Sequence, residues 1–115
     1  MKKGETMNYT KTEREHYNKD KEITCQQLGI TKNQYNWLRR KGQELHRLYE
    51  DNCNGAFQNE SEYENLVNPI YEDVNTYIKN LGLFVYYQTD PRGATIYLDK
   101  KPIPENNYNQ THCIY

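Results

Sequence analysis

Apolar residues recur at helical spacing along two stretches of the chain, which places them on one face of an amphipathic helix. In the first stretch they are Tyr35, Leu38, Leu45, Leu48 and Tyr49. In the second they are Ile70, Val74, Tyr77, Ile78 and Leu81. The pattern therefore predicts two helices, each with an apolar stripe that packs on the rest of the protein.

Capping signals mark where the first of these helices begins and ends. Thr31 with Gln34 fits a capping box, in which each side chain hydrogen-bonds the other residue's backbone. Asn54-Gly55 supplies a residue that can adopt the left-handed conformation closing a helix. A second capping signature lies just upstream, at residues 24–27. The order of these signals predicts a short helix, a tight turn at Gly29 and then the long helix.

Proline sets the predicted start of the second helix. Asn68-Pro69 puts proline at the first helical position, where its fixed φ and missing N–H are harmless. We therefore expect the main helix over residues 69–80, with Gly82 as its stop. Ser61 with Glu64 forms another capping box in the polar loop before it.

Two later segments, residues 83–88 and 94–99, are rich in β-branched and aromatic residues and predict an antiparallel hairpin. Asp90-Pro91-Arg92-Gly93 would join them in a type I turn. One register turns Leu83, Val85, Tyr87, Ile96 and Leu98 toward the helices and leaves Phe84, Tyr86 and Tyr97 on the opposite face. Because a two-stranded hairpin is marginally stable, a third strand is expected within residues 108–115.

These elements predict an α+β fold, with two or three helices packed on a small antiparallel sheet. Residues 1–20 lack an apolar face, so we expect a flexible N-terminal segment before a single domain of residues 21–115. Thr12 with Glu15 fits a capping box, so a short solvent-exposed helix is the alternative for part of that segment.

The sequence also indicates the cellular compartment of the protein. The 115 residues contain no apolar run longer than Leu83–Tyr87, too short to cross a bilayer. Lys2 and Lys3 precede no apolar region of the kind that a secretory signal needs. Cysteines are odd in number and widely spaced, which favours reduced thiols; they are Cys25, Cys53 and Cys113. We therefore expect a cytoplasmic protein with no membrane partner.

No catalytic or metal-binding motif stands out in the sequence. His46 and Cys53 lie about 10.5 Å apart along one helix, too far for a thiolate–imidazole pair. No C-x-x-C or H-x-x-x-H spacing suggests zinc, and no glycine-rich loop suggests a nucleotide, so we expect neither metal nor cofactor. The remaining catalytic hypothesis, a small hydrolase or nuclease, would use Asp90, Arg92 and His112.

Charge and aromatic content instead favour a binding surface. The chain carries 12 tyrosines, and aromatic residues are frequent anchors of interfaces. Residues 21–50 contain six basic and three acidic residues, whereas residues 51–78 contain six acidic residues and no basic one. The predicted partner-binding residues are Tyr86, Tyr97, Asp90, Arg92, Glu60, Glu62 and Glu64.

The predicted helix–turn–helix gives an alternative function, DNA binding. Its second helix would direct basic and amide side chains to a DNA groove and phosphates. These residues are Lys32, Asn33, Asn36, Arg39 and Arg40. Against this reading stand the length of that helix and a net charge of -1.

A series of short motifs resembles a group of small proteins encoded by phages and prophages, over about residues 45–108. The motifs are Leu45-His46-Arg47, Glu50, Cys53-Asn54-Gly55, Leu81-Gly82-Leu83, Tyr87-Gln88-Thr89-Asp90-Pro91-Arg92-Gly93, Ile96-Tyr97-Leu98 and Asn107-Tyr108. The segment between Gly55 and Pro69 is shorter and more acidic than in the group. The resemblance implies an accessory protein of a mobile element in a bacterial host cell, and it implies no catalytic residue. Its expected partner is a host protein or nucleoprotein complex.

The leading hypothesis is thus a non-enzymatic protein that binds a host macromolecule, most specifically an inhibitor of a host defence system, similar to an anti-CRISPR protein. Control of phage or host transcription by a helix–turn–helix is the alternative, and a small hydrolase or nuclease is the third.

Overall fold

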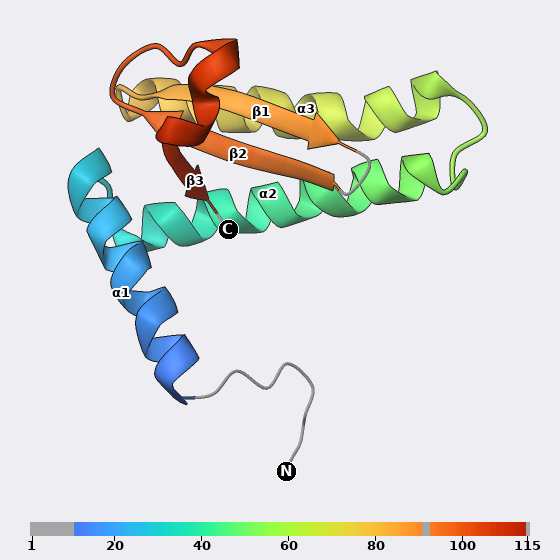
Figure 1. Cartoon of the computed structure of the whole chain (residues 1–115). Helices are drawn as coiled ribbons and strands as arrows, with labels where there is room; N and C mark the ends of the chain where they lie inside the picture. Colours follow the sequence, from blue (N-terminus) through green and yellow to red (C-terminus); the bar gives the residue numbers. More distant parts are fainter. Residues whose placement is uncertain (1–10, 91–92, 115) are drawn as a thin grey trace.

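The computed structural model describes residues 11–90 and 93–114, which form an α+β fold (Figure 1). The helices are α1 (Lys11–Leu28), α2 (Lys32–Cys53) and α3 (Glu60–Asn80). The strands are β1 (Phe84–Asp90), β2 (Gly93–Asp99) and β3 (His112–Ile114), with a 3₁₀ segment, η1 (Glu105–Gln110), before the last. The predicted fold class is confirmed. Among the described helices, none has the length and apolar content required to span a bilayer.

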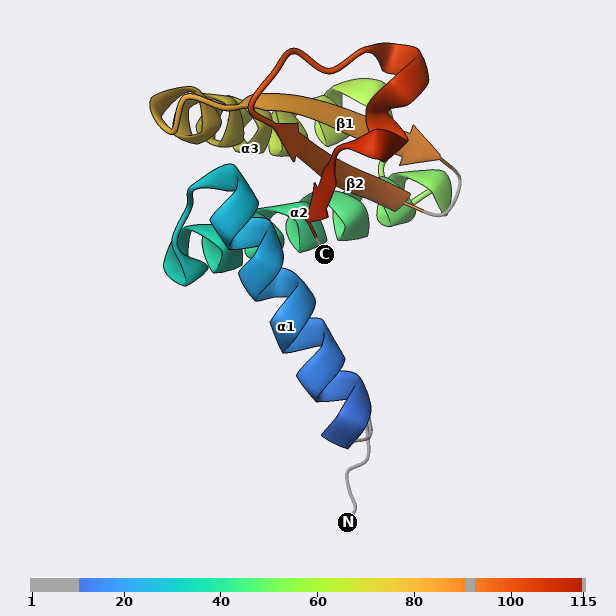
Figure 2. The ribbon, with the colours of Figure 1, turned by 60° about the vertical axis from the view of Figure 1, so that its left-hand side comes forward.

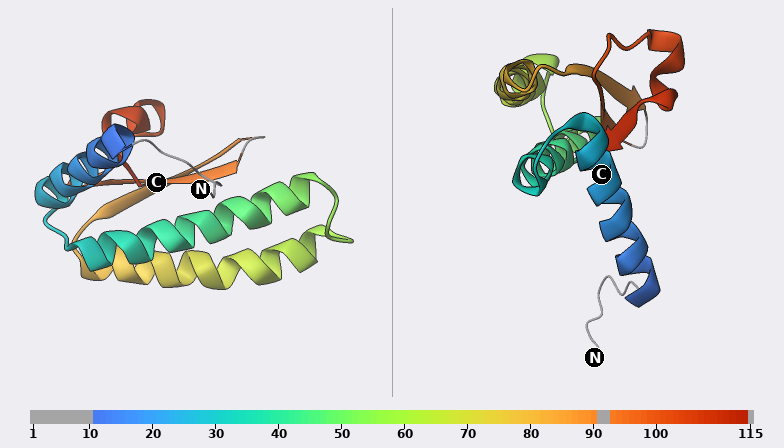
Figure 3. Two further views of the ribbon diagram at one scale, coloured as in Figure 1. Left: turned by 90° about the horizontal axis from the view of Figure 1, so that it is seen from below. Right: turned by 90° about the vertical axis from the view of Figure 1, so that its left-hand side faces the viewer.

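Two layers make up the body of the protein. Helices α2 and α3 run antiparallel side by side, and the three-stranded sheet covers them on one side (Figure 3). The sheet is antiparallel with the order β1-β2-β3, so β1 and β3 are its edges. Between the layers lies one core, to which all three helices contribute. Its most deeply buried side chains are Leu38, Leu45, Val74, Ile78, Ile96 and Leu98.

The predicted strand register is confirmed. Val85 pairs with Leu98 and Tyr87 with Ile96, which turns these side chains toward the helices. Tyr86 pairs with Tyr97 on the opposite face. The turn residues Pro91 and Arg92 lie outside the described residues.

Helix α2 begins where its capping box predicts. The Thr31 hydroxyl accepts from the Gln34 N–H at 3.1 Å, and the Gln34 side chain accepts from the Thr31 N–H at 2.8 Å. Further along, a Cβ at Gly42 would lie 3.4 Å from Ile96 Cδ1 on β2. The missing side chain at this position lets the helix lie close against the middle strand.

The predicted start of the second helix is wrong. Helix α3 begins at Glu60, capped by Asn59, whose side chain accepts from the Glu62 N–H at 3.0 Å. Neither Asn68-Pro69 nor Ser61 caps it, and Pro69 lies inside the helix.

Burial explains why the helix continues through the proline. Val67, in the turn before Pro69, is only 3% exposed, so helical structure there fills part of the core. Pro69 and Asn65 are both exposed. The Asn65 carbonyl has no N–H partner at Pro69, and this interruption of the helix therefore falls on its exposed side.

The predicted short first helix is also wrong in its start. Helix α1 begins at Lys11 and runs through Thr24 to Leu28, across the predicted domain boundary at residue 20. The half before that boundary extends away from the body, and its residues 14–20 are largely exposed (Figure 2). Within residues 14–28 of this helix, the buried side chains are Cys25 and Leu28, both in its last two turns.

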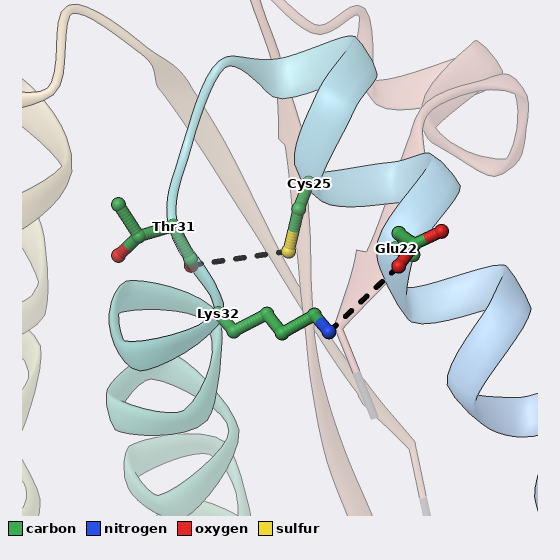
Figure 4. A network of polar contacts seen from close by, with 4 residues as sticks. All are labelled: Glu22, Cys25, Thr31 and Lys32. Carbon is green, nitrogen blue, oxygen red and sulfur yellow. Dashed lines mark hydrogen bonds and ion pairs between the residues drawn. The ribbon is translucent and has the colours of Figure 1, made fainter.

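The tight turn after α1 is confirmed. Gly29 has φ +74°, and the N–H groups of Gly29 and Ile30 donate to the Cys25 carbonyl at 2.8 and 3.0 Å. Ile30 is buried, and the Cys25 thiol lies 3.8 Å from the Thr31 carbonyl oxygen (Figure 4). The two helices therefore meet in a packed corner.

The predicted third strand exists but is shorter than residues 108–115. β3 spans His112–Ile114, and Tyr115 lies outside the described residues. Tyr108 is not part of this strand. It belongs to η1, and its ring stacks on Tyr86 of β1.

Replacing Pro69 should stabilise the protein. Pro69→Ala restores the N–H that the Asn65 carbonyl lacks and removes the ring from the helix interior. The gain is offset in part by a more flexible unfolded chain. We expect the free energy of unfolding in urea to rise by about 2 kcal/mol. A decrease would show that α3 requires the proline.

Candidate partner-binding surfaces

Four aromatic residues gather on the face of the sheet that turns away from the helices. The Tyr86 and Tyr108 rings stack with centroids 4.7 Å apart, and Tyr97 meets Tyr108 edge to face at 4.9 Å. Phe84 lies two residues before Tyr86 on β1, and its side chain is 44% exposed. The segment η1 crosses this face in front of the strands (Figures 1 and 2). We call Phe84, Tyr86, Tyr97 and Tyr108 the outer aromatic cluster.

Sequence reasoning named Tyr86 and Tyr97 as partner-binding residues, and the structure places them together in this cluster. It missed Phe84 as a site residue, although strand alternation had assigned it to the same face. Tyr108 gave no such signal, because its position depends on how η1 folds back over the sheet.

The tyrosines on the inner face have a structural role. Tyr87 packs edge to face on Tyr71 of α3, with centroids 4.7 Å apart, and its hydroxyl donates to Asn75 Oδ1 at 2.6 Å. Burial raises the pKa of Tyr87, and the neighbouring Tyr71 raises it further. Burial also raises the pKa of Tyr71, and it raises the pKa of Tyr63 to about 12. The contacts of Tyr87 with Tyr71 and Asn75 join β1 to α3.

The three predicted glutamates at the start of α3 are exposed but differ in position. Glu62 accepts from the Gln58 N–H at 2.9 Å, which gives it a capping role. Glu60 and Glu64 lie one turn apart on the flank of α3 that also carries Tyr71 and Asn75. Tyr71 and Asn75 both contact Tyr87, so this part of the flank lies beside β1. Glu64 and Glu60 lie further toward the start of α3, roughly 10 and 16 Å from Tyr71 along the helix axis.

The register separates the members of the catalytic hypothesis. His112 pairs with Leu98, five residues along β2 from Gly93 at the hairpin turn. At strand spacing this distance is roughly 16 Å. Arg92 and the Asp90 side chain lie outside the described residues.

The cysteines also show no activated thiol pair. All three are free. Burial raises the pKa of the Cys113 thiol, while its hydrogen bond with Tyr97 acts in the opposite direction. Burial likewise raises the pKa of Cys25. His112 and Cys113 are adjacent on β3, so their side chains point to opposite faces of the sheet.

The predicted DNA-reading residues divide into two groups. Asn36 accepts from Lys21 Nζ at 2.8 Å, and the Arg39 guanidinium lies 5.8 Å from the centre of the Tyr17 ring, so α1 engages both. The other three are exposed, and they are Lys32, Asn33 and Arg40. Of these, Lys32 forms a solvent-exposed ion pair with Glu22 at 3.7 Å (Figure 4).

A cleft of about 320 Å³ lies between α2 and the strands β2 and β3. Its polar lining comes from Arg39, Gln43 and His46, at helical spacing along one side of α2. Ile96 and Ile114 supply an apolar floor. The His46 imidazole lies 3.8 Å from the Glu50 carboxylate. Sequence reasoning missed this cleft, since only the fold brings β3 beside α2.

Within residues 11–90 and 93–114, no group of three or more His, Cys, Asp or Glu side chains is placed to hold a metal ion. Among the residues whose burial the structure describes, 14–89, 95–108 and 110–114, no charged side chain is buried. Comparison of the chain with models of protein families, with curated proteins and with solved structures found no match.

Burial of Tyr87 predicts a loss of stability at alkaline pH. Its pKa is higher in the folded chain than the ordinary value of about 10. The stability that the protonated phenol contributes is therefore complete below about pH 10 and is lost as the pH rises toward the folded pKa. In Tyr87→Phe, the free energy of unfolding should fall less steeply above about pH 10 than in the wild type.

Asn75→Ala serves as the control. It removes the acceptor of the Tyr87 hydroxyl but leaves the phenol buried, so the alkaline slope should stay close to that of the wild type. Equal slopes for the wild type and Tyr87→Phe, measured by urea denaturation at several pH values, would contradict this assignment.

Proposed function

We propose that this protein is a non-enzymatic accessory protein of a mobile element that binds a host macromolecule. The outer aromatic cluster is the observation that carries the proposal. An antiparallel sheet with one face on the core usually presents polar side chains to water on the other. Here that face presents four aromatic rings.

The helices do not pack on this cluster, whereas η1 contacts it through Tyr108. The helices are held by the inner face, through Leu83, Ile96, Leu98 and Ile114. The rings of Tyr86 and Tyr97 both contact Tyr108, the Tyr97 hydroxyl also donates to Gln88 Oε1 at 3.3 Å, and Phe84 is 44% exposed. Rigid aromatic side chains lose little conformational entropy on binding and bury a large area, so they act as anchors in interfaces.

Inhibition of a host defence system, such as a nuclease effector, is the specific form of this proposal. It is supported by the resemblance of residues 45–108 to small phage and prophage proteins and by the exposed carboxylates of α3. Defence nucleases have basic surfaces that hold nucleic acid, and acidic proteins can occupy such surfaces by charge complementarity. The partner is therefore expected to be a protein or nucleoprotein complex.

Phe84→Thr should weaken partner binding. Threonine keeps strand propensity but removes the exposed ring, and loss of an anchor typically costs about 2 kcal/mol of binding free energy, roughly a 30-fold change in affinity. Tagged wild-type protein should capture a partner from bacterial host lysate, and its affinity is then measured with the purified partner. If that partner is a nuclease, the same variant should lose inhibition of cleavage.

Leu66→Gln is the matched control. Leu66 is another exposed apolar side chain, 48% exposed on α3, but it lies outside the outer aromatic cluster. The control should bind as the wild type does. No captured partner, or equal loss of affinity in both variants, would count against the proposal.

DNA binding is a second candidate, favoured by the packed corner between α1 and α2. A short turn with glycine joining two helices is the arrangement found in helix–turn–helix proteins. The exposed residues Lys32, Asn33 and Arg40 lie on the first turns of α2. This function would extend to regulation of phage or host transcription.

The variant Arg40→Ala tests the DNA-binding function. If Arg40 contacts a phosphate, the variant should bind duplex DNA more weakly and lower the slope of log affinity against log salt concentration by about 1. Lys79→Ala, an exposed charge on α3, is the control and should leave both quantities unchanged. Identical titrations for the wild type and Arg40→Ala would exclude this use of the corner.

A further inference from the structure

The strand β1 is an open edge of the sheet. It pairs with β2 on one side only, over seven residue pairs from Phe84↔Asp99 to Asp90↔Gly93. Among the described residues, no backbone hydrogen bond joins β1 to any other segment. One side of the strand therefore retains unpaired N–H and C=O groups.

The register shows which residues carry these groups. The Asp90↔Gly93 pair leaves only two residues in the hairpin loop, so this pair exchanges hydrogen bonds and the pairs alternate from there. Val85, Tyr87 and Thr89 then direct their N–H and C=O groups away from β2. Three alternate residues on one edge match the spacing of an added strand.

Before its last residue, Asp90, the β1 strand has none of the usual protection against pairing. Proteins commonly block an edge with lysine, with proline, with a bulge or with a very short strand. From Phe84 to Thr89, β1 contains no charged residue and no proline, and its register with β2 is continuous. Nothing in the strand itself repels an incoming segment.

The charged residues of α3 beside β1 indicate what kind of segment would pair with this edge. The flank of α3 next to β1 carries Tyr71 and Asn75, which contact Tyr87. Helical spacing places three exposed glutamates on or next to that flank, with one lysine. These residues are Glu60, Glu64, Glu72 and Lys79. A strand added to β1 would lie over this flank, so basic side chains on it would be attracted.

We propose that the edge of β1 binds an extended, basic segment of a partner protein, which joins the sheet as a fourth strand. Backbone hydrogen bonds to Val85, Tyr87 and Thr89 provide register, and the glutamates of α3 select basic side chains. This inference rests on the proposed function, because it names the partner class. A second copy of this chain fits less well, since pairing two β1 strands would bring two acidic flanks together.

The probe is a synthetic peptide of about eight residues, the length of a long strand, that alternates lysine with valine. Hydrogen exchange of the amides is followed by NMR. With the peptide bound, the N–H groups of Val85, Tyr87 and Thr89 should exchange about tenfold or more slowly, while the exposed end of α1 is unaffected. The same peptide with glutamate in place of lysine should give no protection.

Two pairs of variants separate the backbone and charge contributions. Thr89→Pro removes one N–H of the edge, whereas Thr89→Val keeps it; the first should weaken peptide binding about tenfold and the second should not. Glu64→Lys reverses a charge on the flank beside β1, and Asp73→Lys makes the same change on the other side of α3. Only the former should weaken binding.

Unchanged exchange of the β1 amides in the presence of the lysine peptide would overturn the inference, and this readout uses only the wild-type chain. Protection that instead grows with protein concentration, without peptide, would assign the edge to a second copy and also overturn it. Failure here leaves the proposed function standing if Phe84→Thr still impairs capture of a partner. Failure of that capture leaves the peptide result unaffected.

Discussion

Packing of α2 against the middle of the sheet is the constraint on which the rest of the structure depends. This helix contacts α1, α3, β2 and β3, so it connects both other helices to the sheet. Gly42 allows the close approach to Ile96, and Leu38 and Leu45 on the same helix are completely buried. Helix α3 adds Val67, Ile70, Val74 and Ile78 to the same core, so the buried aliphatic residues form one cluster.

The outer face of the sheet takes no part in the packing of the helices. The helices cover only the inner face, η1 covers part of the outer face, and β1 is an edge of the sheet with Phe84 44% exposed (Figures 1 and 3). The outer aromatic cluster, the edge and the acidic flank of α3 all adjoin β1. A single partner that covers this side of the molecule would bury aromatic rings, pair with backbone groups and neutralise carboxylates in one interface.

The tyrosines divide between two roles that composition alone does not distinguish. Tyr71 and Tyr87 lie between α3 and β1, where burial raises the pKa of both and one hydroxyl bonds Asn75. Tyr86, Tyr97 and Tyr108 lie on the outer face and contact one another. The first group stabilises the fold, whereas the second is the proposed contact surface.

Local signals in the sequence determined the α+β class, the start of α2 at Thr31, the turn at Gly29 and the register of the hairpin, because capping and alternation act between neighbouring residues. Tertiary structure decided where those signals were overruled. Burial of Val67 carries α3 through Pro69, stacking on Tyr86 holds Tyr108 out of a strand, and α1 engages Asn36 and Arg39. Each outcome depends on contacts between residues distant in the chain, and local propensity does not encode the free energy of those contacts.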